Sequence, residues 1–78
     1  MDRLQQAFRQ ALALPFSFDV ALADLNAVSQ WDSVAHLQLV VAIEDTFGIR
    51  LSPGDVIELN SFASAITILH RHGVLSDA

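Results

Sequence analysis

The chain has 78 residues, of which 53% are hydrophobic and 17% charged, a composition that favours one packed domain over a disordered segment. Its formal net charge is −5 and its four basic residues are scattered arginines, which disfavours binding to nucleic acid. It has no cysteine, so it has neither a disulfide framework nor a thiol of its own, and no stretch is long and apolar enough to span a membrane.

The first predicted element is a helix from Asp2 to Leu14. Its apolar residues recur three and four positions apart and form one face, which consists of Leu4, Ala7, Phe8, Ala11 and Leu12. Proline cannot continue a helix, so Pro15 should end it. The long connection over residues 15–31 is rich in apolar side chains, and we expect it to lie on the core with a short helical turn around Ala21 to Leu25. Trp31, at its end, is expected to pack in the core or against the loop.

The central predicted element is a helix from Ser33 to Phe47 that has a signal at each end. Asp32 and Ser33 are good N-capping residues, and Gly48 can adopt the left-handed conformation that ends a helix. One face has the spacing of a core face and consists of Leu39, Ala42, Ile43 and Phe47. A second apolar strip consists of Val34, Leu37, Val40 and Val41, and it is either further core or a surface that meets a partner.

The remaining sequence predicts one turn and two more helices. In chain order these are a turn over residues 48–54, a short helix from Asp55 to Leu59, and a last helix from Phe62 to about His70. Asn60-Ser61 should cap the last helix, and residues 74–78 should form a frayed tail. Because no alternating run persists, the predicted fold is all-α: a small four-helix bundle with three main helices, one short helix and a long first loop.

The residues around Ser33 resemble the signature of the acyl carrier protein family. That signature is Asp-Ser-Leu followed by an amphipathic helix that ends in an acidic run and Phe-Gly-Ile. Here it reads Asp32-Ser33-Val34, then the helix, then Glu-Asp-Thr-Phe-Gly-Ile over residues 44–49. The resemblance covers roughly residues 25–69 and implies a single acyl-carrier domain over residues 1–78, in which Ser33 carries a 4'-phosphopantetheine arm taken from coenzyme A. A helix N-terminus would also favour the anionic phosphodiester of that arm.

The resemblance implies a carrier protein and not an enzyme. The thiol of the arm would hold acyl intermediates as thioesters and present them to other enzymes. The expected partners are a phosphopantetheinyl transferase, which would also meet Asp32, and synthases or other enzymes that activate or transfer acyl groups. The chain shows no signal-peptide pattern, so we expect a cytoplasmic location. We also expect the protein to be a monomer. Two alternatives stay open: an aminoacyl or peptidyl carrier, and an unmodified helical domain that binds a partner through the second strip.

In that family the second helix is the main element that partner enzymes recognise. The expected contact residues here are apolar anchors with an acidic rim, namely Val34, Leu37, Val41, Glu44 and Asp45. The alternative for the three apolar residues is burial under the long loop. Ala35 and Gln38 are neutral where fatty-acid carriers usually have acidic side chains, and Val34 replaces the usual leucine. These departures favour a specialised pathway.

Other residues that could carry chemistry have simpler interpretations. Ser33, taken alone, could be an ordinary N-cap. Ser33 and His36 share a helix face, but a hydrolase also needs an orienting acid, an oxyanion hole and a cleft, so we do not expect one. His70 and His72 are expected to form a polar C-terminal turn that interacts with the helix dipole and not to bind a metal. Asp55 and Glu58 are expected to form a solvated helix start and not an acid–base pair.

Overall fold

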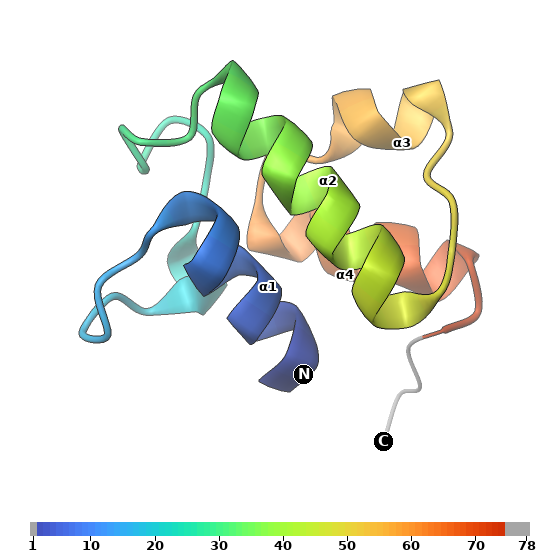
Figure 1. Ribbon diagram of the computed structural model, residues 1–78, viewed down its shortest axis with the longest axis horizontal. Helices are drawn as coiled ribbons and strands as arrows, with labels where there is room; N and C mark the ends of the chain where they lie inside the picture. The colour runs from blue at the N-terminus through green and yellow to red at the C-terminus, as the bar shows by residue number, and fades with distance from the viewer. Residues whose placement is uncertain (1, 75–78) are drawn as a thin grey trace.

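The computed structural model describes residues 2–74, and the helices in this part form an all-α bundle, as predicted (Figure 1). The elements are α1 (Asp2–Leu12), the 3-10 turn η1 (Val20–Leu22), α2 (Ser33–Phe47), α3 (Pro53–Glu58) and α4 (Phe62–Arg71). α2 runs across the middle of the molecule, with α1 on one side of it and the short α3 on the other. Most of the predicted tail, residues 75–78, lies outside the described residues, whereas Val74 packs against the core.

Helix α1 ends two residues earlier than its sequence predicts. Ala13 has a left-handed backbone with φ 52°, and the Leu14 N–H donates to the Arg9 carbonyl at 3.1 Å. This is the Schellman arrangement that often ends helices, with alanine at the position that usually holds glycine. The predicted end at Leu14 is therefore wrong, and Pro15 follows the cap instead of ending the helix itself.

The long connection after α1 lies largely on the core, as predicted, and its buried side chains are Val20, Ala23, Val28 and Trp31. The expected helical turn exists as η1, one residue earlier and shorter than predicted. Asp19 caps it by accepting a hydrogen bond from the Ala21 N–H at 3.1 Å. The expected burial is wrong for three apolar side chains of this segment, Phe16, Leu22 and Leu25, which are 93%, 69% and 47% exposed.

The middle of the long connection pairs with the residues at the N-cap of α4. An antiparallel bridge joins Asp24 to Ser61. On either side of it, the Leu25 N–H donates to the Asn60 carbonyl at 2.8 Å and the Phe62 N–H donates to the Ala23 carbonyl at 3.0 Å. These main-chain hydrogen bonds fix the first loop to a segment far along the sequence.

Helix α2 has the predicted bounds. The Asp32 carboxylate caps its first turn, and Gly48, with φ 66°, ends it. Its core face contains Leu39 and Ile43, as predicted, together with Ala35 and Val40. Of the two alternatives for the second apolar strip, Val40 therefore follows the first, because it lies in the core beside Leu39.

Helices α3 and α4 are both capped by serine. Ser52 forms a capping box with Asp55, so α3 begins at Pro53, two residues before its predicted start. The predicted turn at Pro53-Gly54 is wrong because proline is favoured in the first turn of a helix, where its missing N–H costs nothing. Ser61 caps α4 as predicted and forms a second box with Ser64.

The core is centred on Phe8, whose side chain is fully buried. Its ring meets Trp31 edge to face at a centroid distance of 5.9 Å and Phe62 at 5.1 Å. Edge-to-face pairs of this kind add stabilisation beyond the apolar area that they bury. The three rings join α1, the long loop and α4 in one cluster, which confirms the predicted packing of Trp31.

Candidate functional site at the start of helix α2

Ser33 is the first residue of α2 and does not cap it. The neighbouring Asp32 is the N-cap, and its Oδ1 accepts a hydrogen bond from the Ala35 N–H at 2.8 Å. Ser33 is exposed, and none of the hydrogen bonds formed within residues 2–74 involves its hydroxyl. The interpretation of Ser33 as an ordinary N-cap is therefore wrong, and its hydroxyl is free at the positive end of the helix dipole.

An apolar groove of about 600 Å³ opens beside Ser33. Its walls come from α2, from α3 and from the end of the long loop, and its lining includes Leu25, Trp31, Leu37, Val56, Ile57 and Leu59. Two of its rim residues, Leu37 and Ile57, are mostly exposed. The groove thus places an apolar surface next to a free hydroxyl.

His36 lies one turn after Ser33 and has both ring nitrogens occupied. The Trp31 Nε1–H donates to His36 Nδ1 at 3.0 Å, and His36 Nε2 lies 3.0 Å from the Val56 carbonyl. Because Nδ1 accepts and a carbonyl can only accept, the proton of the neutral ring belongs on Nε2. Neither nitrogen is left to activate Ser33, which agrees with the expectation that the pair is not a hydrolytic one.

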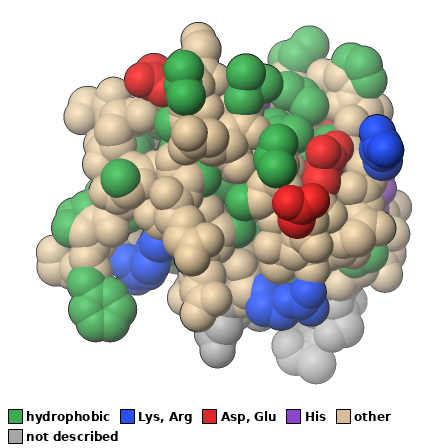
Figure 2. All heavy atoms as spheres, in the orientation of Figure 1, with side chains coloured by type: hydrophobic (Ala, Val, Ile, Leu, Met, Phe, Trp, Pro, Cys, Tyr) green, Lys and Arg blue, Asp and Glu red, His purple; other side chains and the backbone are tan. Residues whose placement is uncertain are grey.

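The second apolar strip on α2, without Val40, is solvent-exposed. Val34 and Leu37 are each 63% exposed and Val41 is 54% exposed. The alternative that the long loop buries these side chains is therefore wrong. A space-filling view shows hydrophobic side chains along this side of the molecule, with acidic side chains close to them (Figure 2).

Four residues of α2 decide the charge of its outer face, and only two of them, Gln38 and Asp45, are exposed. Glu44 is half-buried, and its carboxylate accepts the Leu51 N–H at 2.8 Å, which ties the following turn to the helix. Asp45 and Gln38 are exposed. Ala35 is buried, so its neutrality reflects packing, and only Gln38 changes the charge of the outer face.

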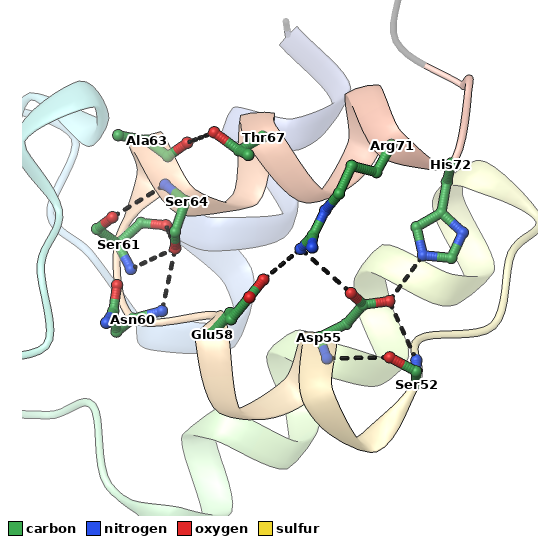
Figure 3. A network of polar contacts seen from close by, with 10 residues as sticks. All are labelled: Ser52, Asp55, Glu58, Asn60, Ser61, Ala63, Ser64, Thr67, Arg71 and His72. Atoms are coloured by element: carbon green, nitrogen blue, oxygen red, sulfur yellow. Dashed lines mark hydrogen bonds and ion pairs between the residues drawn. The ribbon is translucent and has the colours of Figure 1, made fainter.

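Asp55 is not the solvated residue that its sequence context predicts. It is buried, and its carboxylate accepts the Ser52 N–H at 3.2 Å and lies 2.8 Å from His72 Nε2 and 3.3 Å from Arg71 (Figure 3). These interactions, led by the hydrogen bond with His72, lower the pKa of the Asp55 carboxyl although burial alone would raise it. Glu58 is exposed, as predicted, and pairs with the same Arg71. The network fixes α3 to the end of α4.

Two further features are absent from the part of the chain that the structure describes. It holds no group of three or more His, Cys, Asp or Glu side chains that could bind a metal ion. None of its helices is long and apolar enough to cross a membrane.

A family model described as "Phosphopantetheine attachment site" matches residues 2–69. The match includes α1 and so extends beyond residues 25–69, which carry the resemblance seen in the sequence. No curated protein and no solved structure matches the chain. Members of this family bind 4'-phosphopantetheine covalently and work with a phosphopantetheinyl transferase and enzymes that handle acyl groups, typically without catalysing reactions themselves. The chain therefore belongs to the phosphopantetheine attachment site family, as a carrier domain of the acyl carrier protein type.

Proposed function

We propose that Ser33 carries the 4'-phosphopantetheine arm and that the chain acts as one acyl-carrier domain. The observation that carries this proposal is the free, exposed hydroxyl of Ser33 at the N-terminus of α2, which Asp32 caps in its place. In the transfer, the serine oxygen would form a bond to the phosphorus of coenzyme A that bears pantetheine, and the adenosine bisphosphate would leave. The helix dipole stabilises the resulting phosphodiester. When bound, the arm supplies the thiol that this cysteine-free chain lacks.

We further propose that the cargo is an acyl group held as a thioester. The groove beside Ser33 supports this choice, because its lining is mostly aliphatic and aromatic and suits an aliphatic chain. Most of this lining offers no hydrogen-bond partner for the charged amino group of an aminoacyl cargo, and its one carboxylate, Asp32, already caps α2. On this view the chain is not an enzyme, and partner enzymes in the cytoplasm carry out the chemistry.

We assign partner recognition to the outer face of α2. Val34, Leu37 and Val41 supply apolar contacts, and Asp45 supplies a charge at the far end of the helix. Glu44 contributes less than Asp45, because its carboxylate is engaged with the Leu51 N–H. The strip begins immediately after Ser33, so any enzyme that reaches this hydroxyl also covers the first two turns of the strip.

The decisive experiment is the mass of the intact protein after incubation with coenzyme A and a broad-specificity phosphopantetheinyl transferase. The wild-type protein should gain the mass of one phosphopantetheine, and Ser33→Ala should gain none. Ser29→Ala, which removes another exposed hydroxyl just before α2, is the matched control and should be modified like the wild type. Modification of Ser33→Ala, or no modification of a folded wild-type protein, would overturn the assignment and favour an unmodified interaction domain.

A further inference from the structure

The groove beside Ser33 has three walls, and one side chain touches all of them. His36 belongs to α2, accepts a hydrogen bond from Trp31 at the end of the long loop, and lies within hydrogen-bond distance of the Val56 carbonyl in α3. Its ring also stacks on the Trp31 indole, with a centroid distance of 6.1 Å and an interplanar angle of 25°. His36, Trp31 and Val56 all line the groove.

We propose that His36 is the positioning residue of this groove: its neutral ring holds the loop, α2 and α3 at their spacing, and protonation releases the loop. The neutral ring satisfies both partners, since Nδ1 accepts from the indole N–H while Nε2–H donates to the carbonyl. Protonation adds a hydrogen to Nδ1, which would then face the Trp31 N–H, a donor opposite a donor. The bond to Val56 can persist, but the contact with the loop cannot.

The acidic side chains near His36 do not take part in its contact with Trp31. Asp32 is the one acidic side chain in the groove lining, and its carboxylate is engaged at the helix cap. On α3, Asp55 and Glu58 pair with Arg71 of α4, and neither lines the groove. Each of these acids interacts with partners away from the Trp31–His36 contact.

The two hydrogen bonds of His36 also affect which cargo the groove can hold. Satisfied at both nitrogens, His36 presents no free donor or acceptor to the groove, so the groove stays suited to an aliphatic chain. The inference rests on the proposed function for what occupies the groove, but the link between Trp31, His36 and Val56 is a property of the unmodified protein. The two can therefore be tested separately.

The first test follows the fluorescence of Trp31, which is the single tryptophan of the chain, in the unmodified protein. A protonated imidazole quenches the indole on which it stacks, so we expect the emission to fall when the solution is acidified from about pH 7.5 to about pH 5. His36→Gln keeps one donor and one acceptor but does not titrate, so its emission should not change over this range. Emission that is constant in the wild type, or that falls equally in His36→Gln, would overturn the proposal.

The second test measures thermal unfolding at neutral pH with and without cargo, using octanoyl-phosphopantetheine transferred from octanoyl-coenzyme A. Loading should raise the Tm of the wild type by roughly 4–8 °C, a shift expected from a modest stabilisation of a domain of this size. His36→Gln should keep most of this rise, and His36→Leu, which leaves both partners unsatisfied, should lose it. An equal rise in all three proteins would overturn the role of His36. Failure of the wild type to take up the arm would instead contradict the proposed function, and the fluorescence test would still stand.

Discussion

At the residue scale, Asp32 caps helix α2 and Ser33 does not, and this difference leaves the serine hydroxyl available at the site. A side chain that caps a helix is engaged with the backbone, whereas the side chain after it is free to point outward. Both residue types are good caps, so the sequence alone does not say which one serves. The structure assigns the cap to Asp32 and leaves the Ser33 hydroxyl available.

This assignment predicts different stabilities for two neighbouring alanine variants. Asp32→Ala should lower the free energy of unfolding by about 1 kcal/mol, because the Ala35 N–H loses its partner. Ser33→Ala should change it by less than about 0.5 kcal/mol, as is usual for an exposed side chain without a partner. Urea unfolding followed by circular dichroism measures both values. An equal loss in the two variants would mean that the serine shares in the cap.

At the element scale, the short helix α3 is held by polar contacts with α2 and with the end of α4. His36 ties it to α2, and Asp55 ties it to the end of α4. α3 has only one turn and a half of sequence, too little to be stable alone, so tertiary contacts must hold it in place. The position of this groove wall therefore depends on a few side chains.

The Asp55 contacts predict a specific response to acid. Because the folded-state pKa of this carboxyl lies below its unfolded value near 3.9, its contribution to stability is fully present above about pH 4 and is lost as the pH falls through the folded pKa. Asp55→Asn should lower the free energy of unfolding at neutral pH by about 1–3 kcal/mol and should remove this acid-dependent step. Urea unfolding at several pH values measures both effects.

Glu58→Gln is the control for this prediction, since the exposed ion pair of Glu58 with the same Arg71 should contribute less than about 1 kcal/mol. A neutral-pH stability of Asp55→Asn equal to that of the wild type would contradict the role of the network.

The exposed strip of α2 predicts docking that depends on apolar contact more than on charge. No Asp, Glu, Lys or Arg occurs from Ser33 to Ile43. Leu37→Gln should therefore lower kcat/KM for phosphopantetheinyl transfer about tenfold, the effect of removing an interface hot spot, without changing stability. Added salt should have a small effect, because few charges lie on this face to be screened. Gln38→Ala is the control. A steep salt dependence combined with an unaffected Leu37→Gln would show that docking is ionic.

Elements whose sequence signals are local are the ones that can be predicted from the sequence. Periodicity and caps predict α2 and the start of α4 well, because these signals lie within a few residues of each other. The capping box of Ser52 and Asp55 is equally local, but Pro53-Gly54, which is typical of turns, masks its signal. The contacts of His36 with Val56 and of Asp55 with His72 join residues 20 and 17 positions apart, and no local pattern indicates them.

At the scale of the whole molecule, a chain of 78 residues has one small core and correspondingly little stability in reserve. The aromatic cluster around Phe8 contributes much of this stability, because the cluster joins α1, the loop and α4. The site beside Ser33 depends on this cluster, because Trp31 belongs both to the core and to the groove.

This dependence predicts a large difference between two phenylalanine variants. Phe8→Ala should lower the free energy of unfolding by about 3–5 kcal/mol, because it removes a fully buried ring and leaves a cavity. Phe16→Ala should change it by less than about 0.5 kcal/mol, since its ring is almost entirely exposed. Thermal and urea unfolding compare the two variants. Similar losses would mean that Phe16 has a structural role that its exposure does not reveal.

The bridge between Asp24 and Ser61 also constrains when the protein can acquire its structure during synthesis. The partners of the first loop lie near residue 60, so this loop has nothing to pair with until most of the chain has left the ribosome. Contacts between residues this far apart also slow folding, because the intervening chain must first be ordered. The loop and the groove wall that it forms should therefore be completed only after α4 has been made, whereas the local contacts of α2 can form earlier.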